Sequence, residues 1–109
     1  MRFFFGLVGE AGNRYVVTGL ATPTLKSMED LTDGGRLEVE CDWGIDSTPS
    51  ARRSLASDIL RLFTWANITS SDIDHFAEDI LLKMESGQKW MLSQNDIEAW
   101  LRARHSVVN

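Results

Sequence analysis

Residues 36–43 read Arg36-Leu37-Glu38-Val39-Glu40-Cys41-Asp42-Trp43, with polar and apolar side chains alternating at every step. A period of two is typical of a β-strand that has one face in the core and the other in water. We therefore predict a strand over this stretch. Its inward side chains would be Leu37, Val39, Cys41 and Trp43. Its outward side chains would be Glu38, Glu40 and Asp42.

The first third of the chain carries two further strand patterns. Residues 2–8 and 15–20 are short runs rich in aromatic and β-branched side chains. Residues 9–13 join them, and the glycines and asparagine of this segment suit a hairpin loop. Between 21 and 35, the spacing of the apolar residues favours a short helical turn that ends before Gly34.

Three helices are predicted in the second half, each with its own cap. Thr48 caps the first, and the apolar stripe of that helix runs as far as Ala66. One of residues 69–71 caps the second helix, which ends before Gly87. Ser93 caps the third.

This order of strands followed by helices predicts an α+β fold. We expect a small antiparallel sheet of about three strands, covered on one face by three C-terminal helices. Residues 1–109 are expected to form a single domain, because a chain of this length buries a sufficient core without disulfide or metal.

Composition excludes several classes of function. The net charge is −5 and the pI is near 4.9, so no basic face is available to neutralise phosphates, and direct nucleic-acid binding is not expected. The apolar run 3–8 is too short to span a membrane, and we interpret it as a strand. A single cysteine excludes an internal disulfide. A cytoplasmic protein is the resulting expectation.

Negative charge is concentrated between Glu29 and Asp46. This segment holds seven acids and one base, a net −6, whereas the rest of the chain holds nine acids and ten bases. Neighbouring like charges repel, so the chain keeps them at some cost in stability or for a partner. A solvated face and a partner-binding surface are both consistent with this pattern. The candidate binding residues are Glu29, Asp30, Asp33, Glu38, Glu40, Asp42 and Asp46.

No catalytic, metal or cofactor site is predicted. The acids lack the ligand spacing of a calcium loop, and there is no glycine-rich phosphate loop or zinc motif. We expect His75 on the surface and His105 at a helix end, where a cation suits the helix dipole. Cys41 is expected to be a buried, inert thiol. We therefore expect a protein that is not an enzyme.

Four tryptophans are more than a domain of this size needs. The hydrophobic periodicity puts Trp43 and Trp100 in the core. Trp65 lies off the apolar stripe of its helix, and Trp90 is expected in a linker. These side chains either pack within the domain or anchor a partner, and the sequence is consistent with both interpretations.

Three short motifs stand out: Phe4-Phe5-Gly6, Trp43-Gly44 with the following Ser47-Thr48-Pro49, and residues 90–101. The first two resemble the aromatic-x-Gly start and the central turn of one family of small phage- and plasmid-borne proteins, a domain of unknown function. Residues 90–101 resemble its closing block, Trp-x-Leu-Ser-x-x-Asp-Ile-x-x-Trp-Leu. Ile45-Asp46 departs from the family's Tyr-Gly-Gly. The resemblance implies an origin on mobile DNA and supplies no activity, cofactor or catalytic residue.

We therefore expect a non-enzymatic interaction protein, an inhibitor of a host defence complex of the anti-CRISPR type. Its acidic strand would mimic DNA in the basic groove of a protein or ribonucleoprotein partner. The alternative is a small-ligand-binding or enzymatic domain that uses the turn 43–49 and the start of the following helix, where backbone N–H groups can receive an anion.

Overall fold

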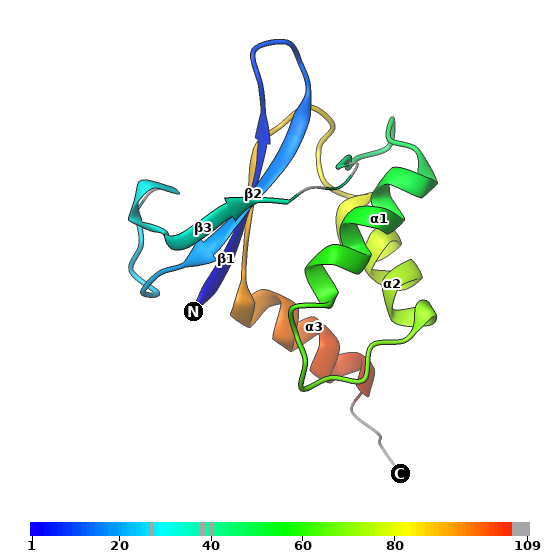
Figure 1. Cartoon of the computed structure of the whole chain (residues 1–109). Helices are drawn as coiled ribbons and strands as arrows, with labels where there is room; N and C mark the ends of the chain where they lie inside the picture. Colours follow the sequence, from blue (N-terminus) through cyan, green and yellow to red (C-terminus); the bar gives the residue numbers. More distant parts are fainter. Residues whose placement is uncertain (27, 38, 40, 106–109) are drawn as a thin grey trace.

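Four antiparallel strands form a sheet, and helices cover one of its faces (Figure 1). The computed structural model describes residues 1–26, 28–37, 39 and 41–105. The predicted α+β class is confirmed, whereas the number of strands and the helix positions differ slightly from the prediction. The elements in chain order are β1 (Arg2–Val8), β2 (Arg14–Leu20), the 3₁₀ turn η1 (Met28–Asp30), β3 (Thr32–Arg36), α1 (Pro49–Leu60), α2 (Ser70–Phe76), the π-helical turn η2 (Ala77–Leu81), β4 (Trp90–Ser93) and α3 (Gln94–His105).

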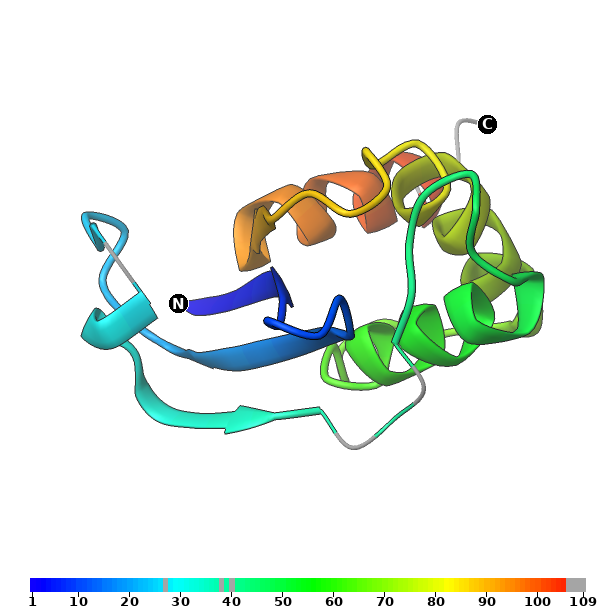
Figure 2. The ribbon, with the colours of Figure 1, turned by 90° about the horizontal axis from the view of Figure 1, so that it is seen from above.

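The strand order is β3-β2-β1-β4. β1 and β2 form the predicted hairpin, in register from Arg2 opposite Leu20 to Val8 opposite Arg14. Viewed from above (Figure 2), α3 lies on the β4 side of the helix layer and α1 on the opposite side. Side chains of even number on β1 and β2 point toward the helices, and two of them, Phe4 and Val16, are fully buried there.

The third strand is earlier than predicted. β3 covers 32–36 rather than 36–43, and all five of its residues are exposed. The Leu37 N–H still donates to the Val16 carbonyl at 2.9 Å, after which the chain leaves the sheet toward the helices. Burial explains the departure, because Trp43 is 0% exposed in the core between the layers. Val39 sits half-buried at a bend outside the core cluster.

A fourth strand replaces the predicted linker around Trp90. β4 pairs with β1, with Trp90 opposite Gly6 and Ser93 opposite Phe3. Residues 90–92 are all apolar, so the stretch shows no period of two, which is why the sequence pattern did not indicate a strand. The indole of Trp90 lies directly on Gly6, where an added Cβ would be 2.1 Å from the ring.

The helix starts agree with the predicted caps. Thr48 accepts a hydrogen bond from the Ala51 N–H, while Thr69 and Ser93 each form a reciprocal capping box with the aspartate three residues later. α1 ends at Leu60 rather than near Ala66, because tighter turns follow it. The second helix ends in the π-helical turn η2, whose last carbonyls are free to accept from outside the helix.

Two tryptophans join the sheet to the helices. The rings of Trp43 and Trp90 meet edge to face, with centroids 5.4 Å apart and planes at 84°. The Trp43 Nε1–H donates to the Gln88 carbonyl at 3.2 Å. Trp43 is in the core as predicted, whereas Trp100 is half-buried against Phe76 at its margin.

Gly44 fixes the chain directly after Trp43. Its N–H donates to the Leu81 carbonyl at 2.8 Å, at the end of η2. Its φ of +91° is in the region that favours glycine, and a Cβ here would lie 2.2 Å from Oγ and 2.9 Å from Cα of Ser86. Both the backbone conformation and the space therefore require glycine.

We predict that Gly44→Ala destabilises the domain by about 3 kcal/mol or more, since left-handed strain adds to overpacking. Gly87→Ala is the matched control, because Gly87 has φ +74° and open space around its Cα. The control should lose only about 1–2 kcal/mol. Urea unfolding followed by tryptophan fluorescence measures both, and equal losses would show that the contact with Ser86 contributes nothing.

Candidate functional site

The predicted binding acids do not form one ladder. Glu29 and Asp30 lie on η1 and Asp33 on β3, and all three are exposed. Asp33 has a φ of +50°, which aspartate tolerates better than most residues. The Lys26 N–H donates to Asp30 at 2.8 Å, so this turn is held by its own acid. These three acids therefore gather at the β3 edge of the sheet.

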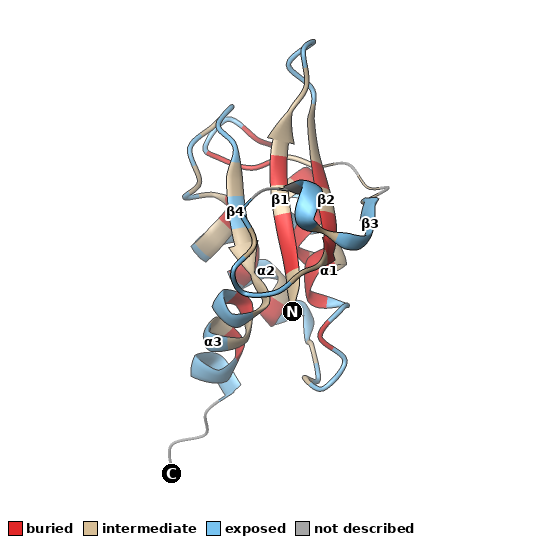
Figure 3. Ribbon diagram, turned by 90° about the vertical axis from the view of Figure 1, so that its left-hand side faces the viewer, coloured by how far each residue is buried: buried red, intermediate tan, exposed pale blue. Residues whose placement is uncertain are grey.

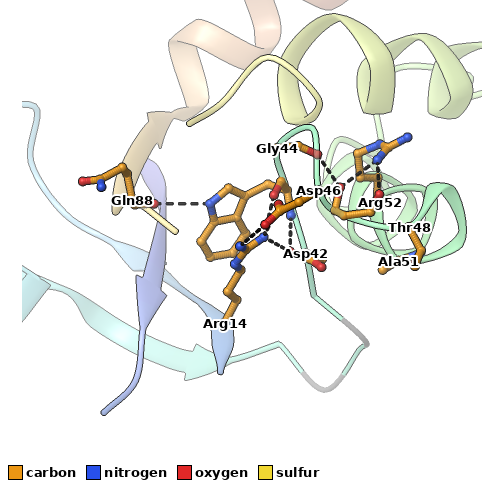
Figure 4. Close-up of polar contacts among 10 residues, drawn as sticks. Arg14, Asp42, Gly44, Asp46, Thr48, Ala51, Arg52 and Gln88 are labelled. Atoms are coloured by element: carbon orange, nitrogen blue, oxygen red, sulfur yellow. Dashed lines mark hydrogen bonds and ion pairs between the residues drawn. The ribbon is translucent and has the colours of Figure 1, made fainter. Parts of the chain in front are cut away.

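Asp42 and Asp46 lie apart from that edge and bind Arg14 of β2. Figure 4 shows the Arg14 guanidinium between the two carboxylates, 3.2 Å from Asp46 and in direct contact with Asp42. It also donates to the Trp43 carbonyl at 2.7 Å. Asp46 raises the pKa of Arg14, and Arg14 in turn lowers the pKa of Asp46. The expectation that Asp42 faces water from a strand is wrong, because Arg14 holds it against the chain.

Glu38 and Glu40, the centre of the predicted ladder, lie outside the residues that the structure describes. Their role as binding residues stays a prediction. The described acids of this segment form two separate groups: one is exposed at the β3 edge, and the other, Asp42 with Asp46, shares the guanidinium of Arg14. Arg14 was missed by sequence reasoning, since nothing in the sequence relates a base at the hairpin end to acids 28 and 32 positions later.

The alternative site, the turn 43–49 with the start of α1, uses its donors internally. Arg52 donates from Nη1 to the Ser47 carbonyl at 2.6 Å and to its Oγ at 2.7 Å (Figure 4). The Ala51 N–H is bound to Thr48, whose carbonyl accepts from the Arg52 N–H. An anion here would have to displace these bonds.

A cavity of about 200 Å³ lies beside this turn, between α1 and α2. Arg53 and Asp74, both on its lining, form an ion pair at 2.7 Å. The remaining charged lining residues are Arg52 and Glu78, so cations and anions are balanced. This charge balance does not select a cationic or an anionic ligand.

A buried carboxylate ties the second helix to the third. Asp72, 3% exposed, accepts from the Thr69 N–H and from Arg104 Nε at 2.9 Å, and lies 3.1 Å from His105 Nε2. Burial raises its pKa, but the bonds from Thr69 and Arg104 outweigh burial and lower the pKa to about 2. The predicted N-cap of α2 indicated part of the surroundings of Asp72. No sequence pattern indicated that Asp72 pairs with Arg104 and His105 of α3. We interpret the cluster as structural, with His105 at the helix end as expected.

The remaining chemical groups have ordinary surroundings. His75 is exposed, with Nδ1 2.7 Å from the Ser71 carbonyl. Cys41 is half-buried, and burial raises the pKa of its thiol to about 11, so it is a weak nucleophile at neutral pH. Within the described ranges, no three His, Cys, Asp or Glu side chains are grouped to hold a metal ion. In the same ranges, no helix has the length and hydropathy to cross a membrane.

Comparison with protein-family models, curated proteins and solved structures finds no match for this chain. The resemblance to the phage- and plasmid-borne family therefore stays a prediction, and the function is argued below from the surface itself.

We predict a pH dependence from Asp72. Its pKa in the folded protein, about 2, is below its ordinary value of 3.8, so ionisation favours the folded state. The contribution, about 2 kcal/mol, is complete above pH 4 or so and is lost as pH falls toward 2. Urea unfolding of wild type and Asp72→Asn between about pH 6 and pH 2 measures it. The wild type should lose its advantage over the variant as the medium becomes more acidic; a constant difference would contradict the assignment.

Proposed function

We propose that this chain is a non-enzymatic interaction protein that binds a basic surface of a protein or ribonucleoprotein through its acidic segment 29–46. The observation that carries the proposal is the β3 edge. β3 is exposed over its whole length, and Glu29, Asp30 and Asp33 lie on it or directly before it. Attraction between these acids and a basic partner gives fast, salt-sensitive association.

The β3 edge also needs its charge for another reason. An exposed edge strand invites pairing with other chains, and charged side chains protect against that. Two of the seven acids in this segment, Asp42 and Asp46, already share Arg14. The concentration of Glu29, Asp30 and Asp33 within five positions at this edge supports a basic partner in addition to edge protection.

Arg14 separates two groups of acids within segment 29–46, those that it binds and those at the β3 edge. It pairs with both Asp42 and Asp46 and holds the chain at Trp43, which fixes the place where the segment joins the helix layer. The acids offered to a partner are then those toward β3, together with Glu38 and Glu40 as predicted residues. This division deepens the sequence prediction, in which all seven acids bind alike.

The alternative, an anion- or ligand-binding turn at 43–49, has less support. Its polar groups are already hydrogen-bonded within the chain. Thr48 accepts from the Ala51 N–H, Arg52 donates to the Ser47 carbonyl, and Ser47 Oγ donates to the Gly44 carbonyl. The identification of the partner as a CRISPR effector or another defence complex rests on the resemblance alone.

The test is protection of phage in bacteria whose CRISPR immunity targets that phage, across a panel of effector types. Expression of the chain should restore plaques for at least one type. Glu29→Lys with Asp33→Asn should reduce plaque recovery by about tenfold or more, because it turns attraction into repulsion at the β3 edge. Asn is chosen at 33 because it tolerates the positive φ.

The matched control is Glu10→Lys with Glu85→Gln, which changes net charge equally at exposed sites away from β3. It should protect like the wild type. An equal loss of plaque recovery in both variants would show that overall charge, rather than the β3 edge, causes the effect. If the wild-type chain protects phage from no effector type, the defence-inhibitor function is contradicted.

A further inference from the structure

The connection between α1 and α2 presents an exposed tryptophan. Most of residues 61–69 are exposed, in the loop below α1 in Figure 3, and Trp65 itself is 53% exposed. Trp43 is fully buried and Trp90 and Trp100 are half-buried, each in an edge-to-face contact with another ring. Packing within the domain therefore explains these three tryptophans, and it does not explain Trp65.

A hollow of about 110 Å³ lies beside Trp65. Leu62 of the same connection lines it and is 44% exposed, and Arg2 and Gln94 line it from the starts of β1 and α3. The Arg2 N–H donates to Gln94 Oε1 at 2.9 Å, which holds these two elements together at the hollow. A space of this size is below the range of small-ligand pockets and suits one side chain of a partner.

Arginines border the hollow. Arg2 lines it, and the Arg102 guanidinium lies over the Trp65 ring, 5.8 Å from the centroid. The Arg102 side chain is 71% exposed, so its charge is accessible to a partner. Arg61, also exposed, adds a third base to this connection.

α3 carries two acids in its first two turns, and both have partners within the chain. Glu98, whose side chain is 15% exposed, lies 3.9 Å from Arg102 and accepts from Gln94 Nε2 at 3.4 Å. Asp96 accepts from the Ser93 N–H at 3.0 Å in the helix cap. No acid is among the described residues that line the hollow. The charge that borders it is therefore opposite in sign to the net −5 of the chain.

Tryptophan and arginine are among the side chains that contribute most to binding at protein interfaces, above all where they border a pocket that a partner fills. We call Arg2, Leu62, Trp65 and Arg102 the Trp65 site. We infer that the Trp65 site binds an acidic protein segment, which inserts one aliphatic side chain into the hollow and places carboxylates against the two arginines. The inference goes beyond the proposed function, because it uses none of the acids 29–46 and needs a ligand of the opposite charge.

A nucleic acid fits this site less well. A phosphate backbone is bound by several bases along its length, whereas two arginines border the hollow in a chain of net charge −5. Arg102 already lies over the Trp65 ring, on which a nucleobase would otherwise stack.

A second copy of this chain offers no matching segment among its described residues. Leu31, which lies between η1 and β3 with their acids, is half-buried and packs beside Gly19. Ile45 is 86% exposed, but the acid next to it, Asp46, already pairs with Arg14. The acidic segment is therefore expected on a different protein.

The experiment measures binding of a short, dye-labelled peptide by fluorescence anisotropy in low salt. This acidic peptide has one central leucine among aspartates and glutamates. Two comparison peptides replace the leucine by serine, or the acids by asparagine and glutamine. Wild-type protein should bind the acidic peptide about tenfold or more tightly than either comparison, because only that peptide supplies both the aliphatic side chain and the carboxylates.

Trp65→Gln should weaken this binding by about tenfold or more, while keeping the net charge. Its matched control is Met91→Gln, which removes an apolar side chain of similar exposure, 49% against 53%, from β4. Arg102→Gln should weaken binding by about fivefold or more, and its control, Lys83→Gln, removes an exposed base that follows η2. Both controls should bind like the wild type. If Trp65→Gln lowers the melting temperature, Arg102→Gln carries the test, because that side chain is 71% exposed.

Several results would overturn the inference. They are absence of binding of the acidic peptide up to about 1 mM, equal binding of a comparison peptide, and equal loss of binding in a variant and its control. Tighter binding of a thymidine oligonucleotide than of the acidic peptide would overturn it in favour of a nucleic acid. Self-association in sedimentation that Trp65→Gln abolishes would overturn it in favour of a second copy of the chain.

Discussion

The contact between Trp43 and Trp90 holds the two layers together. Trp43 is fully buried, its ring meets Trp90 edge to face, and Trp90 in turn lies on Gly6 of the central strand. The next residue, Gly44, joins the chain to the helix layer, because its N–H donates to the Leu81 carbonyl. The chain between the sheet and α1 is therefore fixed at one point by two large rings and two glycines. Burial of two indoles is among the largest contributions that a core of this size contains.

The position of the acidic segment follows from that contact. Because Trp43 must reach the helix layer, the chain cannot remain in the sheet beyond Leu37, and β3 is left short and exposed. The acids on either side of Trp43, Asp42 and Asp46, then pair with Arg14 of β2, which offsets part of their charge where they approach the core. The exposed acids are left at the other end of the segment. Packing of one tryptophan thus decides which carboxylates remain available to a partner.

The distance in sequence between interacting residues decides which features the sequence predicts. Caps at Thr48, Thr69 and Ser93 are local, since each involves residues three apart, and they were predicted. The hairpin β1–β2 was predicted for the same reason. The strand over 36–43 was wrong because alternation also fits a crossing segment whose inward residues, Leu37, Cys41 and Trp43, reach the core without a sheet partner. β4 and the pairing of Arg14 with Asp42 and Asp46 depend on residues distant in sequence, which no local pattern reveals.

Several residues of the motifs on which the predicted resemblance rests lie at this junction. Trp90 packs on Gly6. Trp43 and Gly44 form the contact between the sheet and the helices, and Ser93 caps α3. Packing or a cap therefore explains these positions without a role in binding. Binding specificity must then be carried by positions that the fold leaves free. In the described structure these include the exposed residues Glu29 and Asp33, where a substitution changes what is presented and leaves the tryptophan contact intact.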